Sequence, residues 1–182
     1  MKAKISSAPP GSLSAGRVSV RGSVGHRRKQ IPTASYDTVF GDDRETTVDD
    51  RAFLETVYDG PVGRGWLGMA RLSYDYYHYN GQYPSDYGAD GIALFGDAST
   101  VHTVTGEVTA RRRMARSHMV TTGVEIRHQI RSRQWAQDVY GEALNVSAPG
   151  SNLAFYAQDE VRIFPGLLGN LASVYNPNPQ AI

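Results

Sequence analysis

The sequence predicts an all-β chain, an antiparallel up-and-down sheet with the strand chemistry of a transmembrane β-barrel segment. Apolar and polar residues alternate with a period of two along several stretches. Long polar connections alternate with short turns rich in glycine and proline. No apolar run approaches the roughly 18 residues of a membrane-spanning helix. We count about six or seven strands, and because a bacterial barrel needs at least about eight, we expect an open, curved sheet.

Composition narrows the function classes. The 182 residues include 19 Lys and Arg against 18 Asp and Glu, and a net charge of +1 gives no reason to expect a nucleic-acid partner. The absence of cysteine excludes disulfide scaffolds, cysteine-based zinc sites and thiol chemistry. None of the five histidines has the spacing of a metal site, and no nucleophile motif occurs. We therefore expect no metal, no cofactor and no enzymatic activity.

The stretch GWLGMARLSYDYYHYN carries the clearest strand pattern. Its even positions are small or apolar, with Trp66 near one end and Tyr76 near the other, and its odd positions include Arg71 and Asp75. Trp66 and Tyr76 are ten residues apart. A tilted strand of about 9–11 residues spans a bilayer, and aromatic side chains collect at both interfaces. The residues that we expect at these interfaces are Trp66, Tyr58, Tyr74 and Tyr76.

The other segments are interpreted in the same way. Further strands are expected over residues 17–25, 51–59, 99–111, 118–131, 152–164 and, with poorer alternation, 167–175. They are joined by long loops over 26–50, 82–97 and 132–150 and by short turns at 60–63, 112–117 and 165–166. Outer-membrane barrels have short turns on one side and long loops on the other, so this alternation favours a barrel over a soluble β-sandwich.

The polar faces of these strands carry charge. A barrel would turn this face to its lumen, where the charges either pair across neighbouring strands or face a ligand held by the long loops. Two polar residues, His128 and Asp159, interrupt the apolar faces. The charged residues that we expect to face the lumen are Arg71, Asp75, Glu107, Glu125, Arg127, Glu160 and Arg162.

Several segments carry a family resemblance. The strand and turn NLAFYAQDEVRIFPGL and the strand TTGVEIRHQ resemble barrel segments of TonB-dependent outer-membrane receptors, and RGSVGHRRKQIPTASYDTVFGD is similar to another such segment. The resemblance implies a barrel of about 22 strands closed by an N-terminal plug. It also implies a receptor that imports a scarce nutrient, such as a ferric siderophore or cobalamin, with energy from the TonB complex.

This chain departs from the family pattern in lacking a signal peptide, a plug and a TonB box. We therefore expect a disordered N-terminal segment over 1–15, a partial barrel over 16–176 and a tail over 177–182. A fragment of this kind is not expected to transport alone, and the TonB complex would be a partner only through the missing plug. The full-length parent is expected in the outer membrane.

Lipid and lipopolysaccharide are the partners expected there, with the basic run at 27–29 near lipopolysaccharide phosphates. The alternative is a soluble β-sandwich that binds carbohydrate or another ligand, with the tyrosines as a platform.

Overall fold

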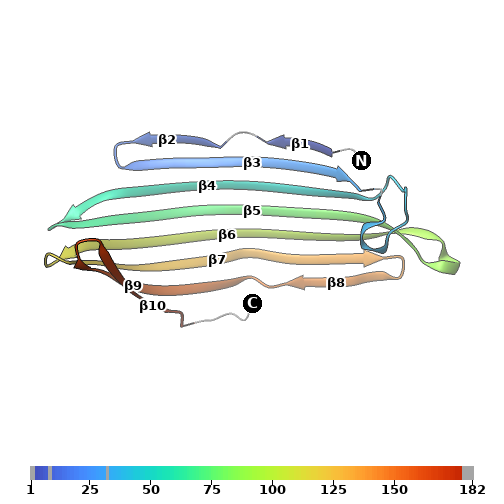
Figure 1. Ribbon diagram of the computed structural model, residues 1–182. Coiled ribbons are helices and arrows are strands. Elements are labelled where there is room, and N and C mark those ends of the chain that lie inside the picture. The colour runs from blue at the N-terminus through green and yellow to red at the C-terminus, as the bar shows by residue number, and fades with distance from the viewer. Residues whose placement is uncertain (1–2, 8–9, 32, 178–182) are drawn as a thin grey trace.

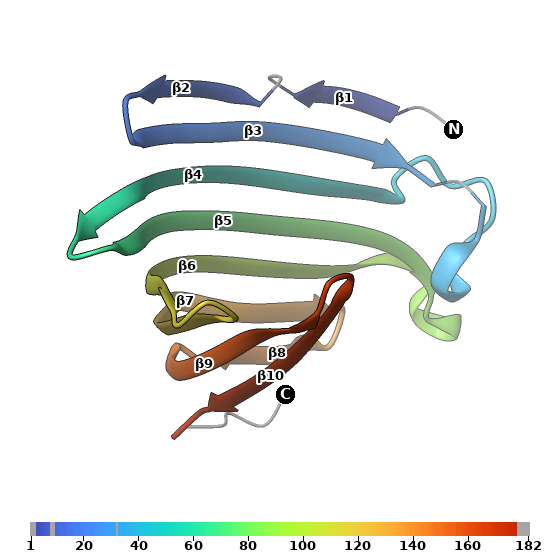
Figure 2. The same ribbon diagram turned by 60° about the vertical axis from the view of Figure 1, so that its left-hand side comes forward.

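The chain folds as a single antiparallel sheet. The computed structural model describes residues 3–7, 10–31 and 33–177, and these residues form ten strands and no α-helix. Figure 1 shows the strands side by side in one layer, and Figure 2 shows that this layer is curved and that its two edges do not meet. The predicted all-β, up-and-down, open and curved sheet is therefore confirmed.

The strands are long. In chain order they are β1 (Ala3–Ser7), β2 (Gly11–Ala15), β3 (Val18–Gln30), β4 (Thr46–Gly63), β5 (Trp66–Asp86), β6 (Ile92–Met114), β7 (His118–Asp138), β8 (Gly141–Ser147), β9 (Gly150–Phe164) and β10 (Leu167–Tyr175). Two 3-10 turns, η1 (Ser35–Asp37) and η2 (Gly88–Asp90), lie in the connections. In the described ranges, no helix has the length and the apolar character needed to cross a membrane.

The ten strands occupy eight positions across the sheet. The hydrogen-bonded path runs β1-β3-β4-β5-β6-β7-β9-β10, while β2 also pairs with β3 and β8 also pairs with β7. Because β1 and β2 pair with successive parts of β3, they act as one interrupted edge strand. In the same way, β8 and β9 follow each other along β7. The prediction of six or seven strands was therefore too low.

The turns between β4 and β5, between β6 and β7 and between β9 and β10 lie at one end of the sheet, whereas the two-residue turn between β7 and β8 lies at the other (Figure 1). Figure 1 places the β4–β5, β6–β7 and β9–β10 connections at its left-hand end and the segment between β3 and β4 at the other. The predicted turn at 60–63 is wrong, because β4 continues to Gly63 and the chain reverses at Arg64 and Gly65. Both of these residues have positive φ, 50° and 76°, the requirement of a two-residue hairpin turn.

The predicted long loops are shorter than expected. Pairing of β5 with β6 continues to Asp86 and Ile92, so most of the predicted loop over 82–97 is strand. The predicted loop over 132–150 contains the end of β7 and all of β8, and only residues 31–45 separate β3 from β4. The reason is that backbone hydrogen bonds extend a ladder wherever two strands stay adjacent, whether or not the side chains alternate.

The N-terminal segment also differs from the prediction. Residues 1–15 were expected to be disordered, but the described part of this segment forms β1 and β2 along the edge of β3. These strands pair with backbone groups of β3 that would otherwise be open, and Pro10 lies between them, outside both ladders. The predicted tail over 177–182 lies, apart from Pro177, outside the described residues.

The register defines two faces. Ala70 lies opposite Val108 on the side that we call the apolar face, and Arg71 lies opposite Glu107 on the side that we call the charged face. No second layer covers either side, because the described strands form one sheet. Among the described residues the one buried hydrophobic side chain is Ala136. The described part of the chain therefore has no conventional hydrophobic core.

A β-bulge exchanges the faces of β7 near its middle. His102 of β6 pairs with Arg131 of β7, and the next residue, Thr103, pairs with Gln129, so Ile130 of β7 has no partner on β6. Before this bulge the even residues of β7 lie on the apolar face, and after it the odd residues do, beginning with Arg131. Ala136 consequently lies on the charged face. Without the bulge, its even number would have placed it on the apolar face.

Candidate functional site

A cluster of paired charges occupies the centre of the charged face. Arg71 Nη2 on β5 lies 2.8 Å from Glu107 Oε2 on β6 and 3.3 Å from Glu125 Oε2 on β7. Arg71 Nη1 lies 3.8 Å from Glu55 Oε2 on β4, and Glu55 also accepts a 2.5 Å hydrogen bond from Arg21 Nε on β3. Five adjacent strands, β3 to β7, are thereby linked by one network of ion pairs.

Charge in this network is balanced. Arg127 adds a contact of 3.5 Å to Glu125, so three guanidinium groups face three carboxylates. The Glu55 residue is only 2% exposed, although no second layer covers it. A buried carboxylate is costly unless it is paired, and here each one has a cation within reach. Charges of neighbouring strands therefore pair at Arg71, Glu107 and Glu125, whereas Arg127 contacts Glu125 on its own strand.

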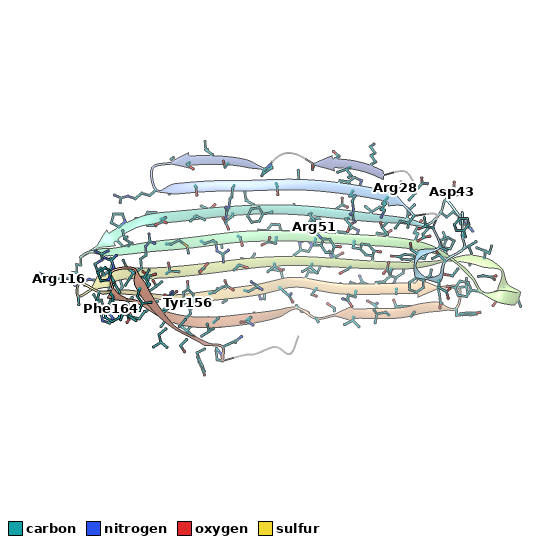
Figure 3. The ribbon with its side chains drawn as sticks, in the orientation of Figure 1. Arg28, Asp43, Arg51, Arg116, Tyr156 and Phe164 are labelled. Carbon is teal, nitrogen blue, oxygen red and sulfur yellow. The ribbon has the colours of Figure 1, made fainter. Side chains whose placement is uncertain are left out.

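A tyrosine from β9 extends the cluster. Tyr156 lies over Gly123 of β7, and its hydroxyl donates a 2.7 Å hydrogen bond to Glu107 Oε1. A Cβ at Gly123 would come within 2.3 Å of the Tyr156 ring, so glycine leaves the space that the ring fills. Figure 3 shows Tyr156 toward the short-turn end of the sheet and Arg28 at the opposite end.

Three of the expected lumen-facing residues do not join the cluster. Asp75 lies on the charged face and accepts a weak hydrogen bond of 3.4 Å from Ser73 Oγ. Glu160 and Arg162 share the parity of Tyr156 on β9, and no described side chain forms an ion pair with either. All three residues therefore lie on the charged face, but none of them forms an ion pair with another described side chain.

Three members of the cluster were missed as site residues, namely Arg21, Glu55 and Tyr156. Each has the parity of the charged face in its own strand, so the signal was present in the sequence. What the sequence lacks is the register between strands, which decides that Glu55 and Glu107 approach the same guanidinium.

The apolar face is exposed rather than packed. Leu72 is 60% exposed and Val108 is 55% exposed, and both lie in the middle of their strands. Isolated exposed hydrophobic residues are ordinary on a protein surface, whereas a contiguous set indicates a surface that is covered by something else. The large hydrophobic residues exposed on this face include Val18, Val20, Val24, Leu54, Leu72, Tyr74, Val108, Ile126 and Phe155.

Aromatic and polar side chains bound this apolar area at both ends. At one end the guanidinium of Arg112 lies 5.7 Å from the ring centre of Trp66. At the other end Tyr74 Oη and His102 Nδ1 are hydrogen-bonded at 2.7 Å, and the Tyr76 ring lies 5.0 Å from that of His102. These aromatic residues lie on the apolar face at the two predicted levels.

The fourth expected interface residue lies elsewhere. Tyr58 is on the apolar face and pairs with Ala70 of β5, which is four residues beyond Trp66. Tyr58 therefore lies inside the apolar area and not at its edge. Its hydroxyl donates a 3.1 Å hydrogen bond to the carbonyl of Pro61, in the direction of the short turn. The phenol oxygen is therefore satisfied within the chain itself.

Beyond Tyr76 the apolar face becomes polar. One cross-strand row contains His26, Asp50, His78, Thr100 and Arg133. His26 Nδ1 lies 2.6 Å from Asp50 Oδ1, and His78 Nδ1 is hydrogen-bonded to Thr100 Oγ1 at 2.9 Å. Arg133 belongs to this row because the bulge in β7 has turned it to this face. The change from apolar to polar character is thus abrupt.

The two polar interruptions of the apolar face have partners. Asp159 Oδ2 lies 2.8 Å from His118 Nδ1, so the carboxylate that breaks the pattern of β9 is paired with β7. His128 Nδ1 is hydrogen-bonded to Ser151 Oγ at 2.7 Å. Each of these two polar groups thus has one partner within the protein, although Asp159 Oδ1 has none among the described residues.

In the described part of the chain, no group of three His, Cys, Asp or Glu side chains is placed to hold a metal ion.

Comparison with known proteins adds no further assignment: no protein-family model, no curated protein and no solved structure matches this chain. Function is therefore argued from the geometry of the two faces.

Proposed function

We propose that this chain is part of the wall of an outer-membrane β-barrel, with its apolar face toward lipid and its charged face toward a wet lumen. One observation carries the proposal. The central side chains of the apolar face are exposed, while those of the charged face are paired and partly buried. A sheet in water would hide the apolar residues, whereas a sheet in lipid does the reverse.

The extent of the apolar area supports the same proposal. It runs on β5 from Trp66 to Tyr76, and polar side chains follow at both ends. This is the length of about 9–11 residues with which a tilted strand crosses the hydrocarbon region. β5 and β6 continue well past Tyr76, so in this arrangement they project beyond the membrane on the side of residues 31–45.

We infer further that the full-length parent is a receptor of the TonB-dependent type in the outer membrane. The segments that resemble this family support it, and the parent would bind and import a scarce nutrient such as a ferric siderophore or cobalamin. The chain alone is not transport-competent in this proposal, because a partial wall encloses no pathway. Its partners are outer-membrane lipid and lipopolysaccharide, and the TonB complex acts only through a plug.

Only one residue of the basic run at 27–29 remains as a candidate lipopolysaccharide contact in this proposal. Arg27 is bound to Asp49, with Nη2 to Oδ2 at 2.7 Å, on the charged face. Arg28 lies opposite Val48 on the other face, beyond the apolar area. Arg28 is therefore the residue of the run that is suited to lipopolysaccharide phosphate.

The alternative of a soluble β-sandwich needs two sheets packed face to face, and the described strands form one.

Refolding into lipid vesicles tests the membrane proposal. The full chain, diluted from urea into vesicles, should acquire β-sheet circular dichroism and co-float with lipid. In a Trp135→Phe chain, which keeps Trp66 as its one tryptophan, brominated lipids should quench the fluorescence of Trp66, which we place at the interface. A monodisperse monomer that unfolds cooperatively in buffer without lipid or detergent would contradict the proposal, since it would show that the apolar face is stable in water.

A further inference from the structure

A cavity lined by aromatic side chains lies on the charged face, beyond the level of Tyr76. It has a volume of about 550 Å³ and lies between β5 and β6, on the side of η2. Its described lining contains one ionisable carboxylate, that of Asp97. The lining residues are Tyr77, Tyr79, Tyr83, Ser85, Phe95, Asp97 and Ser99.

The fold makes room for this carboxylate. Asp97 on β6 lies between Gly81 of β5 and Ala136 of β7, two of the smallest residues. A Cβ at Gly81 would stand 2.3 Å from Asp97 Oδ1 and 2.6 Å from Tyr79 Oη, so any other residue would displace the carboxylate or the phenol. Ala136 reaches this position only because the bulge exchanges the faces of β7.

One oxygen of the Asp97 carboxylate, Oδ1, is closed off from solvent and lacks a hydrogen-bond partner among the described residues. This contrasts with the central cluster, where each carboxylate meets a guanidinium. Burial raises the pKa of the Asp97 carboxyl, because the charged form is poorly solvated there. The site therefore holds a carboxylate that forms no ion pair with any described side chain.

The surrounding rings suit a cation. The negative face of a tyrosine ring attracts positive charge, and the guanidinium of Arg51 already lies 4.9 Å from the Tyr77 ring centre at the margin of the cavity. The Tyr77 hydroxyl donates a 3.1 Å hydrogen bond to Asp49, which is itself paired with Arg27. Tyr79 and Tyr83 are hydrogen-bonded to each other through their hydroxyls. The nearby charges of Asp49 and Arg27 are thus neutralised, while Asp97 is not.

We propose that this cavity binds an organic ammonium cation, with Asp97 as its counter-ion and the tyrosine and phenylalanine rings around its alkyl groups. An anionic ligand would be repelled by the carboxylate. A neutral ligand such as a sugar would stack on the rings but leave the charge of Asp97 uncompensated. The inference goes beyond the proposed membrane function, because the cavity lies outside the apolar area.

Choline and its neutral isostere 3,3-dimethylbutan-1-ol form a probe pair that tests the charge directly. The full chain, folded in dodecyl maltoside micelles, is titrated with each probe and binding is followed by tyrosine fluorescence and calorimetry. We expect saturable binding of choline and binding of the alcohol that is at least about tenfold weaker, because a charge-assisted contact is lost. Choline should also bind more weakly on acidification, since protonation of Asp97 removes the counter-ion.

Variants locate the site. Asp97→Asn should weaken choline binding about tenfold or more, and Asp59→Asn, at the exposed short-turn end of β4, should leave it unchanged. Equal affinity for choline and the alcohol, no saturable choline binding, or full binding by the Asp97→Asn protein would each overturn the proposal. Because the probe pair needs no variant, the result stands even if a variant misfolds. Vesicle insertion is measured separately, so failure of this site and failure of the membrane proposal are distinguishable.

Discussion

Arg71 Nη2 on β5 lies 2.8 Å from Glu107 Oε2 on β6, and this ion pair is the centre of the charged cluster. Arg71→Met should lower the free energy of unfolding by about 2 kcal/mol, because Glu55, Glu107 and Glu125 would then repel one another without their shared cation. The expected loss is smaller than that of a fully buried pair, since the Arg71 side chain is 31% exposed. Urea unfolding in micelles measures it.

The matched control is Arg127→Met. The Arg127 side chain is 57% exposed and makes a contact of 3.5 Å to Glu125 alone. Its loss should cost less than about 1 kcal/mol. Equal effects of the two substitutions would show that the cluster does not depend on Arg71.

Val124→Arg and Thr121→Arg test which face meets lipid. Both residues lie on β7, Val124 on the apolar face and Thr121 on the charged face. Arginine toward lipid near the middle of a bilayer costs about 2–4 kcal/mol, so Val124→Arg should reduce folding into vesicles, read as the heat-resistant band on a gel. Thr121→Arg should fold nearly as well as the unchanged chain. If both fold alike, the assignment of faces is wrong.

Ser73 and Thr105 have the same parity as Thr121 but are poorer controls. Each is only 5% exposed, so an arginine there would overpack the charged face for reasons unrelated to lipid.

Gly123→Ala should destabilise the sheet by about 1–3 kcal/mol. The new methyl group would clash with the Tyr156 ring and push the tyrosine hydroxyl away from Glu107. Gly106→Ala is the control. It lies on the apolar face of β6, where a Cβ meets only Ile126 Cγ2 at 3.4 Å. Urea midpoints of the two variants should differ clearly, and similar midpoints would show that Tyr156 does not depend on the glycine.

Asp97→Asn should raise stability at neutral pH. The folded protein holds the pKa of Asp97 above its ordinary value, so it binds a proton more readily than the unfolded chain, and stability falls as the pH rises through this range. The substitution removes this penalty, and its advantage should vanish below the ordinary pKa of an aspartate. Urea midpoints at several pH values measure it, with Asp59→Asn as the control. An advantage that persists in acid would contradict the account.

Much of the architecture followed from local patterns. The alternation around Trp66 and Tyr76 predicted β5, its two faces and its aromatic ends, since successive side chains of a strand must point to opposite sides. The same parity placed Arg71, Glu107 and Glu125 together on one face. The weak alternation of residues 82–97 and 132–150 gave no such indication, because a strand beyond the apolar area need not alternate.

The sequence by itself determined the type of element and the chemistry of each face. Only the tertiary structure decided the register where long connections intervene, because pairing between β3 and β4 or between β7 and β9 joins residues far apart in the chain. Register sets Arg71 among three carboxylates, and His118 beside Asp159. The bulge at Ile130 is a case of the same kind: one unpaired residue exchanges the two sides of β7 and seats Ala136 beside Asp97.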